Sequence, residues 1–314
     1  MTVFETLNWA ANCLKDNQIE NPRLNAELLL AHSLNLDREG LYVRLHSKMK
    51  KEEKKTLEKL IKRRISGEPL QYILGHQEFW SIDFKVDSRV LIPRPETELL
   101  VEQSLSILSE TLFKRPPFVL EIGTGSGAVA ISLAKEVRNI FLVATDISGD
   151  ALMLAKENAK SSGLLHQIQF VKGNLFDPFR LLKEREPFDL ILSNPPYITC
   201  SEIGGLVREV RDYEPIIALN GGEDGLTFYR TIISEAPFYL KKGGWLLLEM
   251  GQAQGKEVTE LIEKMGDFLA PQRYQDLSGI DRVVKAQRKV RNSKPENYCC
   301  SKLKVQGSKE KQLL

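Results

Sequence analysis

The sequence predicts an α/β protein, in which a parallel sheet carries helices on both faces and follows a small helical domain. Three observations support this prediction. From residue 93 onward, short buried runs typical of strands alternate with amphipathic segments typical of helices. Residues 1–75 show the apolar spacing of helices instead. The length of 314 residues suits two domains, or one large domain with an appendage.

Composition indicates a globular chain, because 42% of the residues are hydrophobic and 27% are charged. No run approaches the roughly 20 apolar residues that cross a bilayer, and the N-terminus lacks the layout of a signal peptide. The cysteines are too scattered for a disulfide framework or a zinc site. We therefore expect a cytoplasmic protein that binds no membrane and no metal. The cysteines are Cys13, Cys200, Cys299 and Cys300.

The overall charge of +2 conceals a basic C-terminal tail. Residues 285–314 contain nine Lys/Arg and two Asp/Glu, so the rest of the chain has a net charge of about −5. A mildly acidic body argues against a protein built to bind nucleic acid. The tail has few apolar residues, and we expect a disordered extension over residues 288–314.

Two helices are expected in the N-terminal part. One begins at residues 21–23, because Leu24, Leu28 and Ala31 follow at helical spacing. Another covers residues 48–65, where an apolar stripe lies among many lysines and arginines. That basic face is either a solvated helix surface or a surface for an acidic partner.

Residues 78–86 alternate between apolar and polar side chains and predict a short hairpin. The expected organisation is a helical substrate-recognition domain over 1–75, a hairpin linker over 76–92, the α/β domain over 93–287 and the tail over 288–314. Five buried strands are expected in the sheet, at 118–122, 140–145, 168–171, 188–193 and 245–250. A further short strand over 281–285 is expected at the edge of the sheet.

A glycine loop follows the first sheet strand and precedes a helix. In open parallel sheets ligands bind at the carboxyl ends of the strands, and glycines let the backbone approach a ligand closely. Asp146 ends the next strand, where a carboxylate accepts hydrogen bonds from both hydroxyls of a ribose. The pattern predicts a nucleoside site, although a dinucleotide site would show nearly the same signs. The loop consists of Glu121, Gly123, Thr124, Gly125, Ser126 and Gly127.

Glu121 favours one cofactor over a dinucleotide. A carboxylate beside the glycines would repel a pyrophosphate but suits a cationic amino-acid moiety. S-adenosylmethionine (SAM) has that moiety and a ribose, and it has no phosphate. Asn174 follows the third strand and is expected at the adenine edge, with Leu175 or Phe176 against the adenine face. Asn174 has an alternative interpretation as a turn residue that caps the strand.

The fourth strand ends in Asn194-Pro195-Pro196-Tyr197. An amide-type nitrogen has a delocalised lone pair, so a methyl acceptor of this kind must be held with its lone pair toward the methyl group. The side-chain carbonyl of Asn194 and the backbone carbonyl of Pro195 would accept from its two N–H bonds. The prolines stiffen the backbone, and Tyr197 offers an apolar face to the planar acceptor. The alternative is a turn that only ends the strand.

Positioning chemistry of this kind needs no strong base. None of the four histidines is expected at a strand end that faces the glycine loop, and the sequence contains no Ser-His-Asp or metal-binding pattern. The histidines are His32, His46, His76 and His166.

Six stretches together resemble the peptide chain release factor glutamine methyltransferases, the PrmC/HemK family. The resemblance covers about residues 5–286. It implies a Rossmann-like SAM-dependent methyltransferase sheet, and it implies methylation of the glutamine amide in the Gly-Gly-Gln loop of class 1 release factors, with S-adenosylhomocysteine as product. The stretches are 67–75 (GEPLQYILG), 91–98 (LIPRPETE), 121–127 (EIGTGSG), 218–226 (ALNGGEDGL), 248–251 (LEMG) and 276–282 (DLSGIDR).

The resemblance also implies roles for residues. Gly123 to Gly127, Asp146 and Asn194 would contact SAM, and residues 194–197 would receive the glutamine. Many family members have Asp and a large aromatic residue where this chain has Asn174 and Leu175. We expect a monomer that acts on class 1 release factors and not on nucleic acid.

Three other functions compete with this one. A methyltransferase for a ribosomal-protein glutamine would share the chemistry, and an adenine-N methyltransferase would need a basic target-binding domain. A SAM-binding module without catalysis would not need Asn194 and Tyr197.

Overall fold

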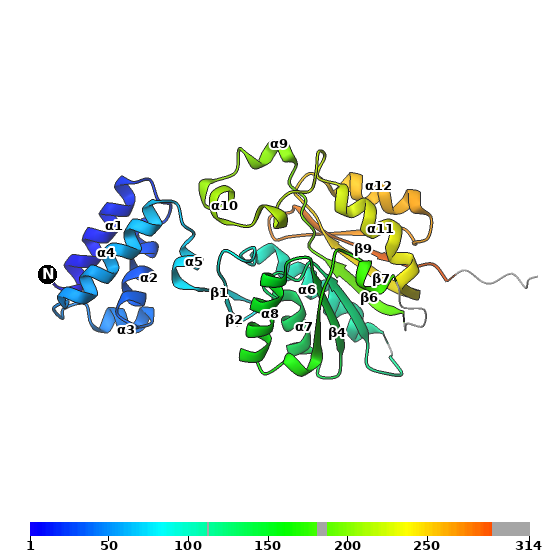
Figure 1. Ribbon diagram of the computed structural model, residues 1–314, viewed down its shortest axis with the longest axis horizontal. Coiled ribbons are helices and arrows are strands. Elements are labelled where there is room, and N and C mark those ends of the chain that lie inside the picture. The colour runs from blue at the N-terminus through cyan, green and yellow to red at the C-terminus, as the bar shows by residue number, and fades with distance from the viewer. Residues whose placement is uncertain (112, 181–186, 291–314) are drawn as a thin grey trace, which may run out of the picture.

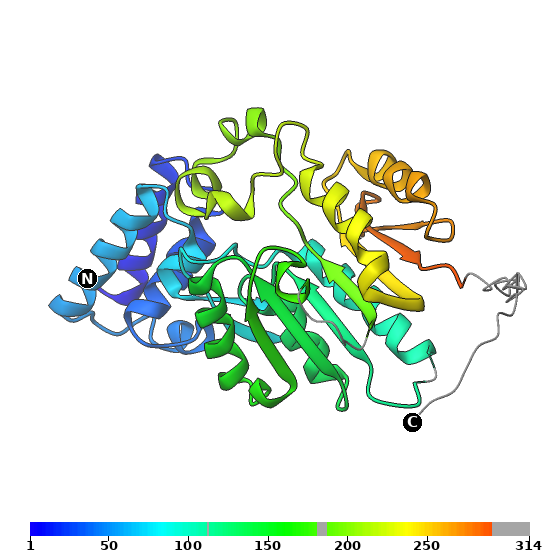
Figure 2. The same ribbon diagram turned by 45° about the vertical axis from the view of Figure 1, so that its right-hand side comes forward.

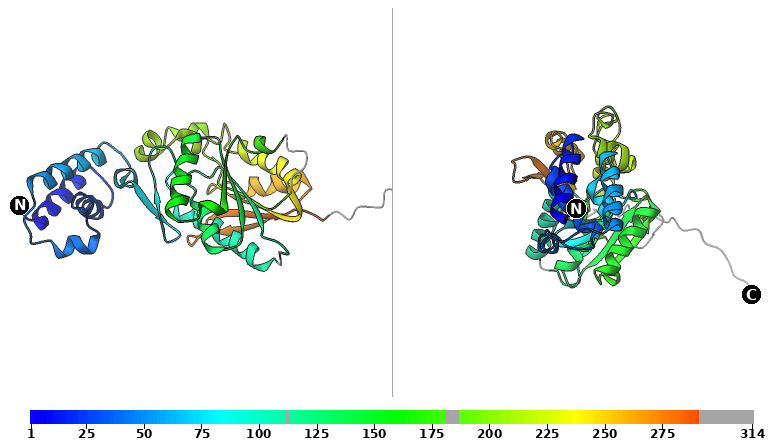
Figure 3. Two further views of the ribbon diagram at one scale, coloured as in Figure 1. Left: turned by 60° about the horizontal axis from the view of Figure 1, so that its bottom comes forward. Right: turned by 90° about the vertical axis from the view of Figure 1, so that its left-hand side faces the viewer.

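The computed structural model describes residues 1–111, 113–180 and 187–290, so most of the predicted tail lies outside the described residues. A helical bundle occupies one end of the molecule and an α/β domain the other (Figure 1). Figure 3 shows the bundle as a separate body, joined to the α/β domain by a hairpin. In the described part of the chain, every helix is too short or too polar to span a membrane.

The N-terminal bundle has its own hydrophobic core, which contains Leu7, Leu29, Leu30 and Leu57. The helix expected to begin at residues 21–23 is confirmed as α2, although Leu24 at its start is 41% exposed. This helix packs against several neighbours and buries Ala26, Leu29, Leu30 and Ala31 among them. The bundle comprises α1 (Val3–Asp16), α2 (Pro22–Ser33), α3 (Arg38–Val43), α4 (Lys51–Ile65) and α5 (Leu70–Leu74).

A two-stranded hairpin follows, formed by β1 (His76–Phe79) and β2 (Ile82–Lys85). Its two turn residues, Trp80 and Ser81, have φ of 51° and 52°, as the favoured two-residue hairpin turns require. The side chain of Asn158 accepts from the amide of Lys85 at 2.9 Å and donates to its carbonyl at 3.1 Å. The hairpin is therefore bonded to the α/β domain as well as to the bundle.

The main sheet has seven strands in the order β5-β4-β3-β6-β7-β9-β8. The pairs from β5 to β7 are parallel, and β9 pairs antiparallel with both of its neighbours. The strands are β3 (Phe118–Ile122), β4 (Phe141–Asp146), β5 (Ile168–Lys172), β6 (Phe188–Ser193), β7 (Leu240–Glu249), β8 (Gln272–Gln275) and β9 (Asp281–Gln287).

The expected edge position of residues 281–285 was wrong. They belong to β9, which lies between β7 and β8. Val283 and Val284 of β9 are fully buried, as an interior strand with both faces covered requires. The edge strand is β8, whose sequence QRYQ is polar and carries no buried residue.

Helices cover both faces of this sheet. Helices α6, α7 and α8 pack with Val119 on one face, whereas α11 and α12 pack with Leu120 on the other. These neighbours on β3 point to opposite faces because side chains alternate along a strand. The helices are α6 (Glu98–Glu110), α7 (Ala128–Glu136), α8 (Gly149–Ser161), α11 (Thr227–Tyr239) and α12 (Gly255–Met265). Short 3-10 turns are η1 (Pro95–Thr97), η2 (Leu165–Gln167), η3 (Asp177–Phe179) and η4 (Ile216–Ala218).

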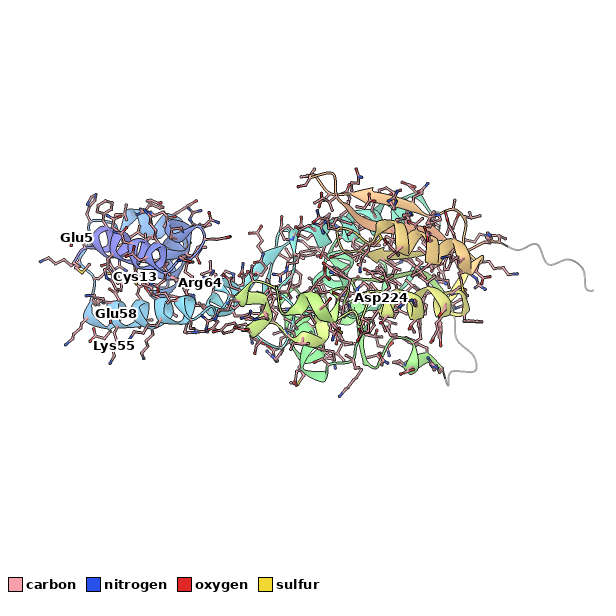
Figure 4. All side chains as sticks on the ribbon, turned by 90° about the horizontal axis from the view of Figure 1, so that it is seen from above. Glu5, Cys13, Lys55, Glu58, Arg64 and Asp224 are labelled. Carbon is pink, nitrogen blue, oxygen red and sulfur yellow. The ribbon has the colours of Figure 1, made fainter. Side chains whose placement is uncertain are left out.

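Residues 199–219 form an arm between β6 and α11, which contains α9 (Cys200–Ile203) and α10 (Arg208–Tyr213). Figure 2 shows the arm, in yellow-green, arching toward the N-terminal helices. Hydrogen bonds and an ion pair join them: Tyr213 Oη donates to the carbonyl of Ser66 at 3.0 Å, and Arg64 pairs with Glu209 at 2.5 Å. Figure 4 shows Arg64 at the end of α4 that lies nearest the α/β domain.

Candidate active site

A cavity of about 410 Å³ opens where β3, β4, β5 and β6 end. Its walls come from the loops after these four strands, from the segment before α6 and from the arm. Every residue that the sequence analysis assigned to a cofactor or substrate lines this cavity, except Gly127, Phe176 and Tyr197. A cavity of this size at the carboxyl ends of parallel strands is the usual place for a ligand in such a fold.

Backbone hydrogen bonds hold the glycine loop against β4. The amides of Gly123 and Thr124 both donate to the carbonyl of Thr145 at 2.9 Å. Gly125 has φ of 55°, and among the described residues nothing lies within 4 Å of the place where a side chain would begin. Gly125 therefore leaves open the space next to the cavity, and its backbone conformation suits glycine.

Gly127 has a different task. It precedes α7 with φ of 82°, and a Cβ there would lie 3.2 Å from the Cβ of Ala155 in α8. Its missing side chain lets two helices pack closely rather than admitting a ligand. Gly127 therefore lies outside the cavity lining and allows the close packing of α7 and α8 next to the loop.

Asp146 lines the cavity and also orders the loop beside it. Its Oδ2 accepts from the amide of Gly125 and its Oδ1 from the amide of Ser148, both at 2.9 Å. Burial raises the pKa of Asp146, and these backbone bonds partly offset that effect. An ionised carboxylate has about four acceptor positions, so these backbone bonds still leave room for a hydroxyl of a ligand.

Glu121 is 3% exposed and nevertheless lines the cavity. Burial raises its pKa to about 8, although Thr124 Oγ1 donates to its Oε2 at 2.6 Å. A cation bound nearby would stabilise the ionised form and lower this pKa. A buried carboxyl at this point fits the cationic amino-acid moiety of SAM and would disfavour a pyrophosphate.

The loop after β5 contributes Asn174 and Leu175 to the cavity. Leu175 has φ of 48°, which is uncommon for a residue with a side chain. Phe176 was wrong as a candidate for the adenine face. It is fully buried in the core, where its ring stacks on Tyr239 with centroids 4.4 Å apart.

The Asn-Pro-Pro-Tyr segment begins where β6 leaves the sheet. Ser193 Oγ donates to the carbonyl of Ile122 at 2.8 Å and so ties this point to β3. Asn194 Nδ2 donates to Thr97 Oγ1 at 3.2 Å. Because this bond uses the NH₂ group, the carbonyl oxygen of Asn194 is left as its hydrogen-bond acceptor. Asn194, Pro195 and Pro196 all line the cavity.

Tyr197 lies beside the cavity lining, and its ring packs against other parts of the chain. A Cβ added at Gly251 would approach the Tyr197 ring to 3.1 Å. Burial raises the pKa of Tyr197 to about 12, so its phenol is neutral at physiological pH and is no base. Among the described residues, no three His, Cys, Asp or Glu side chains form a group that could hold a metal ion.

Sequence reasoning missed the residues that hold this segment in place. A Cβ at Gly221 would lie 2.7 Å from Tyr197 Cα, so only glycine fits there. Gln254 Nε2 donates to the carbonyls of Tyr197 and Gly225, at 3.0 and 3.2 Å. The glycines of the ALNGGEDGL stretch were the available signal, because clustered glycines often mark a close backbone approach.

A second missed feature closes the side of the cavity that faces the arm. Arg94, which lines the cavity, pairs with Glu214 at 2.6 Å, and the amide of Ile92 donates to the same carboxylate at 3.3 Å. Burial raises the pKa of Glu214, and Arg94 opposes that effect. The pair fixes the segment before α6 to the arm.

Two family models match the chain. The PrmC N-terminal domain matches residues 5–75, and a methyltransferase domain matches residues 119–213. The release factor glutamine methyltransferase of Geobacter sulfurreducens is 43% identical, covering 90% of this chain and 95% of that protein. The protein of the same name from Moorella thermoacetica is 40% identical, covering 92% and 99%.

Solved structures support the fold alone. The hMettl16 catalytic domain aligns with a TM-score of 0.52 at 17% identity, covering 72% of this chain and 81% of that one. A human methyltransferase 10 domain containing protein aligns with a TM-score of 0.50 at 16% identity, covering 66% and 88%.

Proposed function

Because this chain belongs to the release factor glutamine methyltransferase family, we propose that it methylates the glutamine of the Gly-Gly-Gln motif in class 1 peptide chain release factors. The methyl group comes from SAM, and the acceptor is the side-chain amide nitrogen. The observation that carries this proposal is the Asn-Pro-Pro-Tyr segment, whose residues 194–196 line one cavity together with the glycine loop.

The cavity offers a matching group for each part of SAM. Glu121 would pair with the cationic amino-acid moiety, and Asp146 would accept from the ribose hydroxyls. Gly125 leaves space for the cofactor, and Leu175 would lie against the adenine, with Asn174 at its edge. When bound, SAM supplies a methyl group that its sulfonium already activates. The protein therefore has to hold SAM and the acceptor amide in the right geometry, and it does not have to activate the methyl group.

Asn194 and Pro195 would provide that position for the glutamine. The Asn194 carbonyl and the Pro195 backbone carbonyl would each accept one N–H of the glutamine amide, which turns its lone pair toward the methyl group. Pro196 keeps the backbone rigid, and Tyr197 supports the segment from outside the cavity lining. Once the nitrogen–methyl bond forms and the sulfur–methyl bond breaks, the nitrogen loses one proton to solvent and S-adenosylhomocysteine remains.

Selectivity for a release factor has to come from other surfaces, because the segment 194–197 surrounds only one planar side chain. The bundle of residues 1–75 and the hairpin β1–β2 are the proposed partner-binding elements. The contact between Arg64 and Glu209 joins that bundle to the arm that lines the cavity. Binding energy from remote contacts would hold the glutamine in the geometry of attack.

Incubation of the purified protein with methyl-labelled SAM and one candidate substrate at a time tests this proposal. The candidates are a class 1 release factor, the same factor with its Gly-Gly-Gln glutamine changed to alanine, a ribosomal-protein preparation and DNA. We expect label only in the unaltered release factor. Label in a ribosomal protein or in DNA, and none in the release factor, would favour the competing functions instead.

A further inference from the structure

A buried carboxyl lies behind Asn194. Glu249 is the last residue of β7, and the register pairs Ser193 of β6 with Leu248 of β7, so Glu249 and Asn194 leave the sheet side by side. Glu249 is only 2% exposed. Its Oε2 accepts no hydrogen bond from any described residue, which is unusual for a buried carboxyl oxygen.

Thr97 connects this carboxyl to Asn194. Its side chain is 5% exposed, and its hydroxyl accepts from Asn194 Nδ2 at 3.2 Å. Thr97 and Asn194 are also the two side chains whose hydrogen bonds favour the ionised form of Glu249. A hydroxyl has one proton, so a Thr97 that accepts from Asn194 is free to donate toward Glu249. Asn194 and Thr97 are therefore placed to act as successive donors toward the carboxylate of Glu249.

We propose that Glu249 is a positioning residue for methyl transfer, whose carboxylate acts with the Thr97 hydroxyl to hold the NH₂ of Asn194 away from the glutamine. The inference rests on the proposed function, because it assigns a task to the environment of Asn194 in that reaction.

The physical reason is the near symmetry of an amide. Its oxygen and its NH₂ have nearly the same shape, so packing alone does not decide which of them faces the substrate. The wrong orientation would point N–H bonds of Asn194 at the N–H bonds of the glutamine, and the acceptor would be lost. A carboxylate behind the NH₂ group stabilises the correct orientation, because an ionised carboxylate only accepts hydrogen bonds.

The arrangement predicts a dependence on pH. The pKa of Glu249 is raised to about 7, mainly by burial and also by the charge of Glu96. The hydrogen bonds from Thr97 and Asn194 and the charge of Arg282 act in the opposite direction and lower this pKa. Two phenols face the same carboxyl: Tyr197, and Tyr229, whose hydroxyl donates to the Glu249 backbone carbonyl at 2.9 Å.

A protonated Glu249 becomes a donor and no longer fixes the NH₂ group. The folded pKa lies above the ordinary value of about 4.3, so the active, ionised form is lost as the pH falls through about 7. The rate of methyl transfer should therefore rise with pH through this range.

The test measures the single-turnover rate of methyl transfer to a class 1 release factor at saturating SAM, from about pH 6 to 8.5. Glu249→Gln should lower the rate at pH 8 about 10- to 100-fold, the equivalent of one hydrogen bond to a charged group, and should abolish the rise near pH 7. Calorimetry should show unchanged affinity for SAM. Asp189→Asn, which removes a buried carboxylate at the opposite end of β6, should keep the rise.

A second pair of variants covers the case in which Glu249→Gln does not fold. Thr97→Val should slow transfer, and Thr97→Ser, which keeps the hydroxyl, should be faster than Thr97→Val. A Glu249→Gln enzyme with the wild-type rate and pH profile, or equal rates for the two Thr97 variants, would overturn the inference alone. A wild-type enzyme that does not methylate the release factor would overturn the proposed function, and the inference with it.

Discussion

Asn194→Ala should separate cofactor binding from methyl transfer. The substitution removes the proposed acceptor for one N–H of the glutamine and the hydrogen bond to Thr97 Oγ1. Loss of one preorganised polar contact to a reacting group costs about 3–4 kcal/mol of barrier, which is roughly a 10²- to 10³-fold slower reaction. The glycine loop, Glu121 and Asp146 remain, so the affinity for SAM should be largely intact.

The assay compares single-turnover rates with calorimetric titrations of SAM on the same preparations. Urea unfolding serves as the control, because the Thr97 hydroxyl loses a buried partner and the free energy of unfolding should fall by about 1–3 kcal/mol. A rate loss of the predicted size in a folded protein that binds SAM normally supports the account. An equal loss in SAM affinity and rate would show that Asn194 is only a cofactor contact and would refute the reasoning.

Five further changes test other parts of the protein. Asp146→Ala should weaken SAM binding by roughly 1.5–3 kcal/mol in calorimetry. Gly125→Val should abolish binding, because its side chain would fill the open space beside a backbone with φ of 55°. Unchanged affinity in either variant would contradict the proposed cofactor site. Arg64→Ala should lower the free energy of unfolding by about 3 kcal/mol, because it leaves buried acceptors in the bundle without a donor and removes the ion pair with the arm. A change near zero in urea titrations would show that the Arg64–Glu209 pair contributes nothing. Deleting residues 1–75 should reduce methylation of a folded release factor far more than of a short Gly-Gly-Gln peptide, and removing residues 288–314 should change both only slightly; equal activity of the intact enzyme on peptide and protein would exclude a recognition role for the bundle.

The central strands were predictable because their buried runs are continuous. The run 118–122 is β3 and the run 188–193 is β6, residue for residue. Strand β8 was missed because its sequence QRYQ has neither an apolar run nor alternation, and only its neighbour β9 makes it a strand. Local pattern is a weak guide at such an edge.

The residues of the candidate site also divide into those that the sequence predicts and those that it does not. Gly125, Asp146 and Asn194 were found because they follow strands directly, where a ligand crevice is expected. Gly221, Gln254 and Glu249 were missed because their contacts with the site join segments that lie far apart in the sequence. No periodicity or spacing marks such residues, since tertiary packing alone brings them together.

Fragmentation mass spectrometry of a class 1 release factor, after incubation with SAM and this protein, tests the central claim most directly. The proposal predicts one added methyl group on the side-chain amide of the Gly-Gly-Gln glutamine, present with the wild-type enzyme and nearly absent with Asn194→Ala. An unmodified glutamine after exhaustive incubation with the folded wild-type enzyme, or a methyl group at another residue, would contradict it.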